Sequence, residues 1–183
     1  MKWRRLLWLL LLLPLVGAVV YWWWDGRLER SQDRPIRAAA HRYGVEPALV
    51  KAIVWRESRF HPRTTGRAGE IGLMQIQEEA AREWADAEHI KGFEHEQCFD
   101  SRTNTLAGTW YLKKLLNRYR QTDNPAAYAL ADYNAGRGNV LKWISGPGTT
   151  NSAAFLEQIG FPATRGYVES VLRRQEKYRA PGG

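Results

Sequence analysis

The sequence predicts a mainly α-helical domain, in the all-α fold class. Apolar residues recur at three- and four-residue intervals in several segments, most clearly over 106–119, which is the period of a helix with one buried face. Pro47 and Pro125 stand where helices are expected to begin, and Gly136 stands where one is expected to end. The sequence has no sustained period-two run bounded by hairpin turns. Its 183 residues, 44% of them apolar, fit one globular domain with a substantial core.

An apolar run precedes this domain. Residues 6–24 carry no charge and end in four aromatic side chains. As a helix the run is about 28 Å long, close to the thickness of the hydrocarbon layer of a bilayer. Aromatic rings favour the membrane interface. We therefore expect residues 1–24 to form a transmembrane anchor. The small residues Val16, Gly17 and Ala18 make a cleaved signal segment the alternative.

The domain itself is expected to cover residues 35–180. Residues 25–34, with alternating charges and few apolar side chains, are expected to be a solvated linker or the start of the first helix. A loop is predicted between Phe60 and Gly72, and Asn124 is the expected N-cap of the helix that Pro125 begins. Helices are predicted over residues 47–58, 77–88, 100–119, 124–136, 138–145 and 164–179.

Glu57 ends an apolar stripe. Steps of four along the chain place it on the same helix face as Val45, Leu49 and Ile53. Burial disfavours the carboxylate anion, and so does the negative end of the helix dipole, so we predict a raised pKa for Glu57. A carboxyl that is protonated near neutral pH can act as a general acid. The alternative is that Glu57 turns outward and pairs with Arg56 or the arginine that follows Ser58.

Three further segments combine turn residues with polar side chains: 72–75, 131–136 and 164–168. Taken singly, each has a plain interpretation. Met74 is typical of a core, and Gln75 of a loop amide. Tyr133 would be a half-buried ring, and Asn134 part of a helix end.

Together with Glu57-Ser58, these segments stand in an order and spacing that resemble the catalytic domain of soluble lytic transglycosylases, lysozyme-like enzymes that cut peptidoglycan. The resemblance spans about residues 36–179, and residues 104–112 are similar to the third helix of that family. Two positions differ from the usual pattern of that family. Glu70 stands where the family usually has a small residue, and Asp132 stands where alanine is common.

The resemblance implies cleavage of the β-1,4 bond between N-acetylmuramic acid and N-acetylglucosamine, with a 1,6-anhydro sugar as product. It implies that Glu57 is the single acid and base, without the second carboxylate that most glycosidases use. It also implies supporting roles. Ser58 would bond substrate or the surroundings of Glu57, Gln75 and Asn134 would hold sugar groups, Met74 and Tyr133 would form an apolar wall, and the Tyr167 hydroxyl would approach Glu57.

Peptidoglycan lies outside the cytoplasmic membrane, so the resemblance implies a single-pass inner-membrane protein whose catalytic domain faces the periplasm or exterior. The net charge of +8 favours an anionic partner, but the sequence has no nucleic-acid motif. None of the four histidines has zinc-site spacing, so we expect no metal and no cofactor. We expect a monomer whose partners are glycan strands and the membrane.

Two other functions remain open at this point. One is lysozyme-type hydrolysis, in which Glu70, Glu78 or Asp132 would position water or stabilise charge. The other is a non-catalytic, membrane-tethered module that binds glycan.

Overall fold

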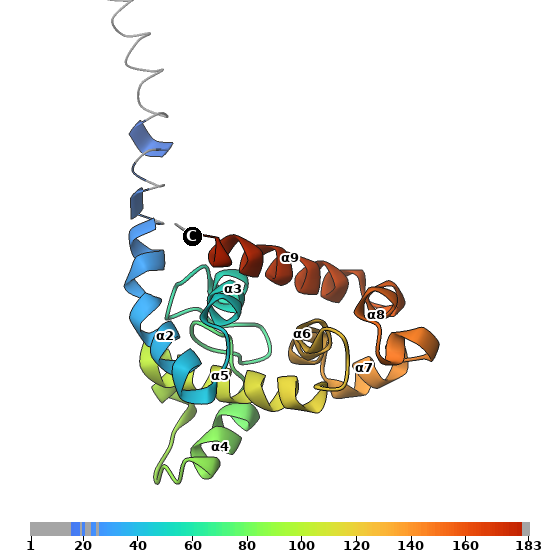
Figure 1. The fold of residues 1–183 in the computed structure, drawn as a ribbon. Coiled ribbons are helices and arrows are strands. Elements are labelled where there is room, and N and C mark those ends of the chain that lie inside the picture. Colours follow the sequence, from blue (N-terminus) through green and yellow to red (C-terminus); the bar gives the residue numbers. More distant parts are fainter. Residues whose placement is uncertain (1–15, 19, 21–22, 25, 181–183) are drawn as a thin grey trace, which may run out of the picture.

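A computed structural model describes residues 16–18, 20, 23–24 and 26–180. Over these ranges the chain is mainly helical, and its β-structure is limited to isolated bridges that join Ile71 to Thr65 and to Ile76 (Figure 1). The predicted all-α class is therefore confirmed. The helices are α2 (Asp33–Tyr43), α3 (Pro47–Ser58), α4 (Glu78–Ala87), α5 (Ser101–Arg118), α6 (Pro125–Ala135), α7 (Arg137–Trp143), α8 (Ser152–Gln158) and α9 (Pro162–Arg179), with 3₁₀ turns η1 (His95–Phe99) and η2 (Gly146–Thr149).

The six predicted helices correspond to α3, α4, α5, α6, α7 and α9, with ends that agree to within two residues. Neither α2 nor the short α8 was among the predicted ranges. Asn124 stands at the N-cap position of α6 as predicted, but its side chain makes no capping hydrogen bond. Asp100 and Asn151 do cap helices, since their carboxylate and amide oxygens accept from Thr103 N–H and Ala154 N–H at 2.9 Å.

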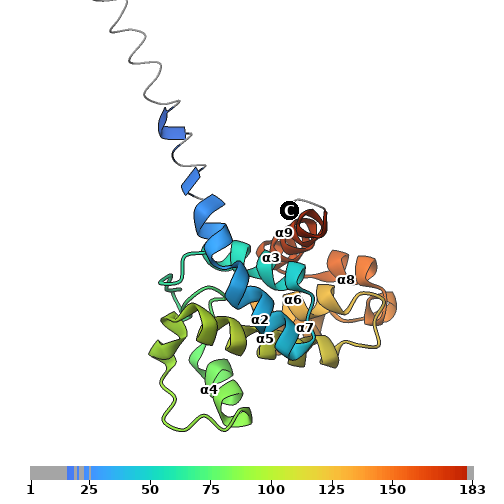
Figure 2. The same ribbon diagram turned by 60° about the vertical axis from the view of Figure 1, so that its left-hand side comes forward.

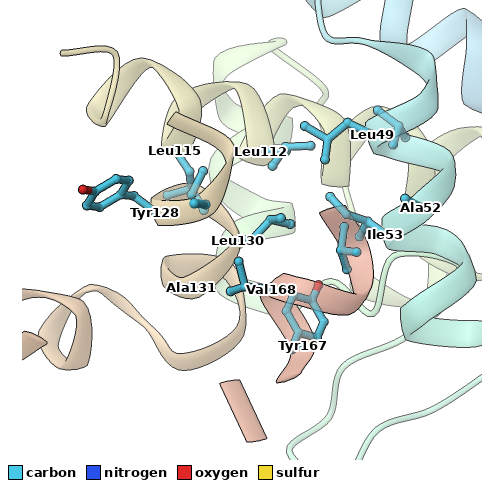
Figure 3. Close-up of a cluster of buried hydrophobic side chains, with 14 of the residues drawn as sticks. Leu49, Ala52, Ile53, Leu112, Leu115, Tyr128, Leu130, Ala131, Tyr167 and Val168 are labelled. Carbon is cyan, nitrogen blue, oxygen red and sulfur yellow. The ribbon is translucent and has the colours of Figure 1, made fainter. Parts of the chain in front are cut away.

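The main core lies where α3, α5, α6 and α9 meet. Figure 3 shows Ile53, Leu112, Leu130 and Val168, one from each helix, converging on this point. All four are fully buried, and burial of such side chains contributes about 1.5–3 kcal/mol each. This packing fixes the C-terminal ends of α3 and α6 relative to one another.

A second buried cluster holds α4 against the loop before it. Trp84 packs edge-on against Phe93, with ring centroids 5.8 Å apart, and both contribute to a cluster that includes Ile71 and Ile76. The Trp84 indole N–H donates to the Tyr43 hydroxyl at 2.8 Å. The loop between α3 and α4 is therefore anchored at its C-terminal end.

The predicted transmembrane anchor lies largely outside the described residues. In the part of the chain that is described, no helix has the length and apolar character needed to cross a bilayer. Residues 25–34 were expected to be either a solvated linker or the start of the first helix. Their described part is helical: residues 26–31 form a helix, which turns at Gln32 into α2 (Figures 1 and 2). Leu28 and Ile36 pack on the main core, so this helix is joined to the domain by buried contacts.

Candidate active site

A groove of about 460 Å³ opens where the end of α3, the loop between α3 and α4, and the end of α6 meet. Its lining comes from five parts of the chain: α3, the loop over 66–77, α4, α5 and the C-terminal turn of α6. The lining residues are Glu57, Gly66, Arg67, Glu70, Gln75, Ile76, Gln77, Ala80, Tyr111 and residues 132–136. The sequence interpretation assigned no site role to Arg67, which belongs to no motif, or to Tyr111, which lies in the 104–112 segment and was noted only for its similarity to the family's third helix.

Glu57 lies at the groove, in the last turn of α3, and is partly buried. The Tyr167 hydroxyl of α9 donates to its Oε1 at 2.6 Å. Burial raises the pKa of Glu57 from 4.5 to about 7, and the charge of Glu70 adds to this rise. The Tyr167 hydrogen bond and the charge of Arg56 act in the opposite direction and lower the pKa. The predicted raised pKa is therefore what the structure shows.

The outward-facing alternative for Glu57 was wrong. Within the described residues Glu57 forms no ion pair, and the Arg59 guanidinium lies 3.9 Å from the centre of the Trp55 ring instead. The reason is the end of α3, where Arg59 adopts a left-handed conformation (φ 51°) that turns its side chain back along the helix.

Ser58 and Met74, expected to bond substrate or the surroundings of Glu57 and to form an apolar wall, are not among the residues that line the groove. Both are buried. The Ser58 hydroxyl donates to the Leu73 carbonyl at 2.8 Å and so joins the end of α3 to the turn over 72–75. Met74 packs against α5 so closely that a Cβ on Gly108 would lie 2.5 Å from its sulfur.

The turn over 72–75 is held by Asn104 of α5, a residue whose role the sequence interpretation did not assign. The Asn104 amide is fully buried and makes three hydrogen bonds. Its oxygen accepts from Met74 N–H at 2.8 Å, and its nitrogen donates to the carbonyls of Ile71 (2.9 Å) and Cys98 (2.8 Å). Gly72 has φ of +77°, and a Cβ there would lie 2.1 Å from the Asn104 nitrogen. Glycine is thus required for both conformation and space.

Gln75, Tyr133 and Asn134, for which the resemblance implies contacts with sugar groups or an apolar wall, line the groove. The Gln75 amide nitrogen donates to the carbonyls of Thr64 (3.0 Å) and Gly72 (2.9 Å). The Tyr133 hydroxyl donates to the Met74 carbonyl at 2.7 Å. The Asn134 amide oxygen accepts from the Thr164 hydroxyl at 2.9 Å. Each side chain is therefore oriented by the protein before any substrate binds.

The three carboxylates considered for hydrolysis occupy different settings. Glu78 is exposed and pairs with Arg82 at 2.6 Å. Asp132 is buried, and its Oδ2 accepts from Arg118 at 2.6 Å and from the Tyr119 hydroxyl at 2.7 Å. Glu70 lines the groove, where its Oε2 accepts from a backbone N–H in its own loop at 3.0 Å. The charge of Glu70 also raises the pKa of Glu57. Of the three carboxylates, Glu70 is therefore the one suited to act beside Glu57 in hydrolysis.

Comparison with known proteins is consistent with this geometry. Residues 34–156 match the transglycosylase SLT domain family. The chain belongs to this family. Over 137 residues it is 37% identical to the soluble lytic murein transglycosylase of Escherichia coli (strain K12). This match covers 74% of this chain and 21% of that protein. It is also 37% identical over 118 residues to the membrane-bound lytic murein transglycosylase C of Pectobacterium atrosepticum, covering 60% of this chain and 32% of that protein.

Solved structures share the fold. An inactive variant of the lytic transglycosylase Slt from Pseudomonas aeruginosa superposes with a TM-score of 0.72 at 26% identity, covering 81% of this chain and 24% of that chain. The 70-kDa soluble lytic transglycosylase of Escherichia coli gives a TM-score of 0.67 at 30% identity. That match covers 78% of this chain and 24% of the other chain. The domain therefore has the lytic transglycosylase fold, and this chain spans between a fifth and a third of the length of these proteins.

Proposed function

We propose that this protein is a lytic transglycosylase that cleaves the β-1,4 bond between N-acetylmuramic acid and N-acetylglucosamine in peptidoglycan. The observation that carries the proposal is Glu57, a partly buried groove carboxyl with a pKa of about 7. Near neutral pH a large fraction of this carboxyl keeps its proton, as a general acid must. Membership of the SLT family and the names of its relatives support the substrate class.

Glu57 acts twice in the proposed reaction. It first gives its proton to the glycosidic oxygen as the bond from that oxygen to the anomeric carbon of the muramic acid breaks. The Glu57 carboxylate then takes the proton of the muramic acid 6-hydroxyl while that oxygen bonds to the anomeric carbon. Glu57 is protonated again, no water is consumed, and the product is a 1,6-anhydro sugar. An intramolecular nucleophile has a high effective concentration, which favours this route.

The groove amides have complementary roles in substrate binding. Because the Gln75 nitrogen is already used by two backbone carbonyls, its oxygen is the atom that accepts from a sugar hydroxyl or acetamido N–H. Because the Asn134 oxygen is used by Thr164, its nitrogen is the atom that donates to a sugar oxygen. Tyr133 supplies an aromatic wall beside them.

Hydrolysis is the second candidate, and the position of Glu70 favours it. A groove carboxylate without a basic partner among the described ion pairs could orient a water for attack on the anomeric carbon. In that case the product would carry a reducing end and be heavier by one water than the anhydro product.

The setting of the enzyme is the periplasmic side of the cytoplasmic membrane. The uncharged run over residues 6–24 and the similarity to a membrane-bound transglycosylase support this location. The groove would then face the cell wall.

Mass spectrometry of purified peptidoglycan digested with the full chain tests the proposed function. We expect products that end in 1,6-anhydromuramic acid, and we expect Glu57→Gln to reduce their formation by at least about 10³-fold, since the acid is lost. Glu78→Gln is the matched control. It removes a carboxylate that is exposed and paired with Arg82, and it should leave the rate unchanged.

Three outcomes would contradict parts of the proposal. Hydrated products that disappear in Glu70→Gln would establish hydrolysis. Full activity of Glu57→Gln would remove Glu57 from the mechanism. Binding of peptidoglycan by the wild type without any cleavage would leave the binding module as the function.

A further inference from the structure

A concentration of positive charge lies on the side of α3 away from the groove. The Arg59 guanidinium lies 3.9 Å and the Arg174 guanidinium 4.0 Å from the centre of the Trp55 ring. Within the described part of the chain, neither arginine lies within 4.0 Å of a carboxylate oxygen. Two like charges on one indole repel each other, so an anion placed between or beside them would be stabilised.

The same surface continues along α9. Arg174 also lies 5.5 Å from the centre of the Tyr178 ring, and Lys177 beside them is exposed. We call Arg59, Arg174 and Lys177, with Trp55 and Tyr178, the basic surface. It combines unpaired cationic groups with amphipathic rings.

The basic surface adjoins the helix over 26–31. Lys51 connects the two: its ammonium lies 4.6 Å from the centre of the Tyr178 ring and pairs with Glu29 at 3.0 Å and Asp33 at 3.1 Å. In Figures 1 and 2, α9 lies at the end of the domain from which this N-terminal helix leaves. Trp23 and Trp24, which precede this helix in the chain, are 56% and 62% exposed.

We propose that the basic surface docks on the anionic phospholipid headgroups of a bilayer. Guanidinium groups bind phosphate oxygens through paired hydrogen bonds, and Trp and Tyr side chains favour the depth at which headgroups lie. Each basic side chain held at an anionic membrane surface strengthens docking about fivefold, so the three together contribute a factor on the order of 100. The exposed tryptophans that precede the adjoining helix add apolar side chains at the same end of the molecule.

Docking of this surface would set the direction of the groove. Trp55 and Glu57 are two positions apart on α3, which separates their side chains by about 200° around the helix axis. With Trp55 against the bilayer, Glu57 and its groove point away from it. The inference concerns orientation at the membrane and does not depend on which reaction the groove performs.

Fluorescence quenching by labelled lipid tests this docking with the full chain. The probe is a maleimide fluorophore on Ala180→Cys, at the end of α9. The native Cys98 is buried, and burial raises its thiol pKa to about 12, so it should not react. The protein is placed in nanodiscs of phosphatidylcholine, with or without one-third phosphatidylglycerol, that contain a headgroup-nitroxide lipid. We expect strong quenching only with phosphatidylglycerol, and we expect salt at about 0.5 M to weaken it.

Two triple variants with the same net charge separate the surface from charge in general. Arg59→Gln/Arg174→Gln/Lys177→Gln should lower the docking equilibrium about 100-fold. The control removes three exposed cations elsewhere, as Lys91→Gln/Arg102→Gln/Arg120→Gln, and should keep the quenching. Thermal unfolding followed by circular dichroism checks both proteins. If the first does not fold, Arg174→Gln/Lys177→Gln takes its place, with an expected loss of about 25-fold.

Equal quenching in neutral and anionic nanodiscs would overturn the proposal, as would equal losses in the two triple variants. Sedimentation with insoluble peptidoglycan tests whether the basic surface binds the wall polymer instead of lipid. If the surface triple loses sedimentation but keeps lipid-dependent quenching, the surface serves the wall polymer and the lipid proposal is wrong. No substrate is turned over in the quenching measurement, so its failure leaves the product assay for the proposed function unaffected.

Discussion

Tyr167 tunes the carboxyl on which the proposed chemistry depends. Its hydroxyl donates to Glu57 and stabilises the anion, so it lowers a pKa that burial raises. Because the protonated form of Glu57 is the active acid, the cleavage rate should fall as the pH rises through about 7.

Tyr167→Phe should move this fall in rate to a higher pH, by about half to one pH unit, because one hydrogen bond to the anion is lost. The pH dependence of kcat measured on soluble glycan fragments checks this. Tyr128→Phe is the matched control: Tyr128 is also buried, and it donates to the Gly148 carbonyl far from the groove. An unchanged profile in Tyr167→Phe would show that the hydroxyl does not act on Glu57.

At the residue scale, the sequence allowed Glu57 to be predicted because helix periodicity is local. Val45, Leu49 and Ile53 are buried as expected, and Glu57 follows them onto the same face. The role of Asn104 could not be predicted in this way. Its partners lie 6, 30 and 33 positions away in the chain, and no local pattern indicates that α5 passes beside the turn over 72–75.

The turn over 72–75 is the element that connects α3, α5 and α6 at the groove. It is held from α3 by the Ser58 hydroxyl, from α5 by the Asn104 amide and from α6 by the Tyr133 hydroxyl. A displacement of this turn would therefore move Gln75 relative to Glu57. Its geometry should be more sensitive to substitution than that of the preceding loop.

Gly72→Ala should destabilise the protein by about 3 kcal/mol or more and abolish most activity, since its Cβ would overlap Asn104 and the Cys98 carbonyl at 2.4 Å. Gly69→Ala is the matched control, with a φ of +88° but open space around the added carbon. It should cost only about 1 kcal/mol of strain. Urea unfolding and the product assay measure both variants, and equal losses would show that the close approach to Asn104 is unimportant.

At the element scale, helix length alone did not decide what could be predicted, since the seven-residue α7 was predicted and α8, of the same length, was not. The apolar period of α5 is clear over residues 106–119, whereas α8 has only seven residues and buries one large side chain, Phe155. Asn124 shows a related limit, because an N-cap residue type does not guarantee the side-chain geometry of a cap. The grouping of Glu57 with Gln75 and Asn134 followed from the family resemblance, but the lining of the groove by Arg67 and Tyr111 depends on how distant elements pack.

For the molecule as a whole, the described N-terminal helix and the domain form one packed unit. Lys51 joins α3 to both parts of that helix through Glu29 and Asp33, and Leu28 packs on the main core. The expectation of a solvated linker did not foresee this, since Leu28 packs on a core made by distant segments. A membrane-attached end would consequently be coupled to the orientation of the groove.

Global stability should depend on pH through Glu57. The folded state holds the Glu57 proton more tightly than the unfolded state, because its pKa rises from 4.5 to about 7 on folding. This contribution is complete below about pH 4.5 and is lost as the pH rises through about 7. Between these limits the free energy of unfolding of the wild type should fall by about 2–3 kcal/mol relative to Glu57→Gln. Urea unfolding of both proteins at several pH values measures the difference, and a constant difference would contradict the buried proton.

Direct titration of the Glu57 carboxyl by carbon-13 NMR tests the central claim most directly. The resonance is assigned by its disappearance in Glu57→Gln, and its chemical shift is followed from pH 3 to 9. We expect a titration midpoint near 7, well separated from the exposed carboxyls. A midpoint near 4.5 would mean that Glu57 is ionised at neutral pH and cannot be the acid of this site.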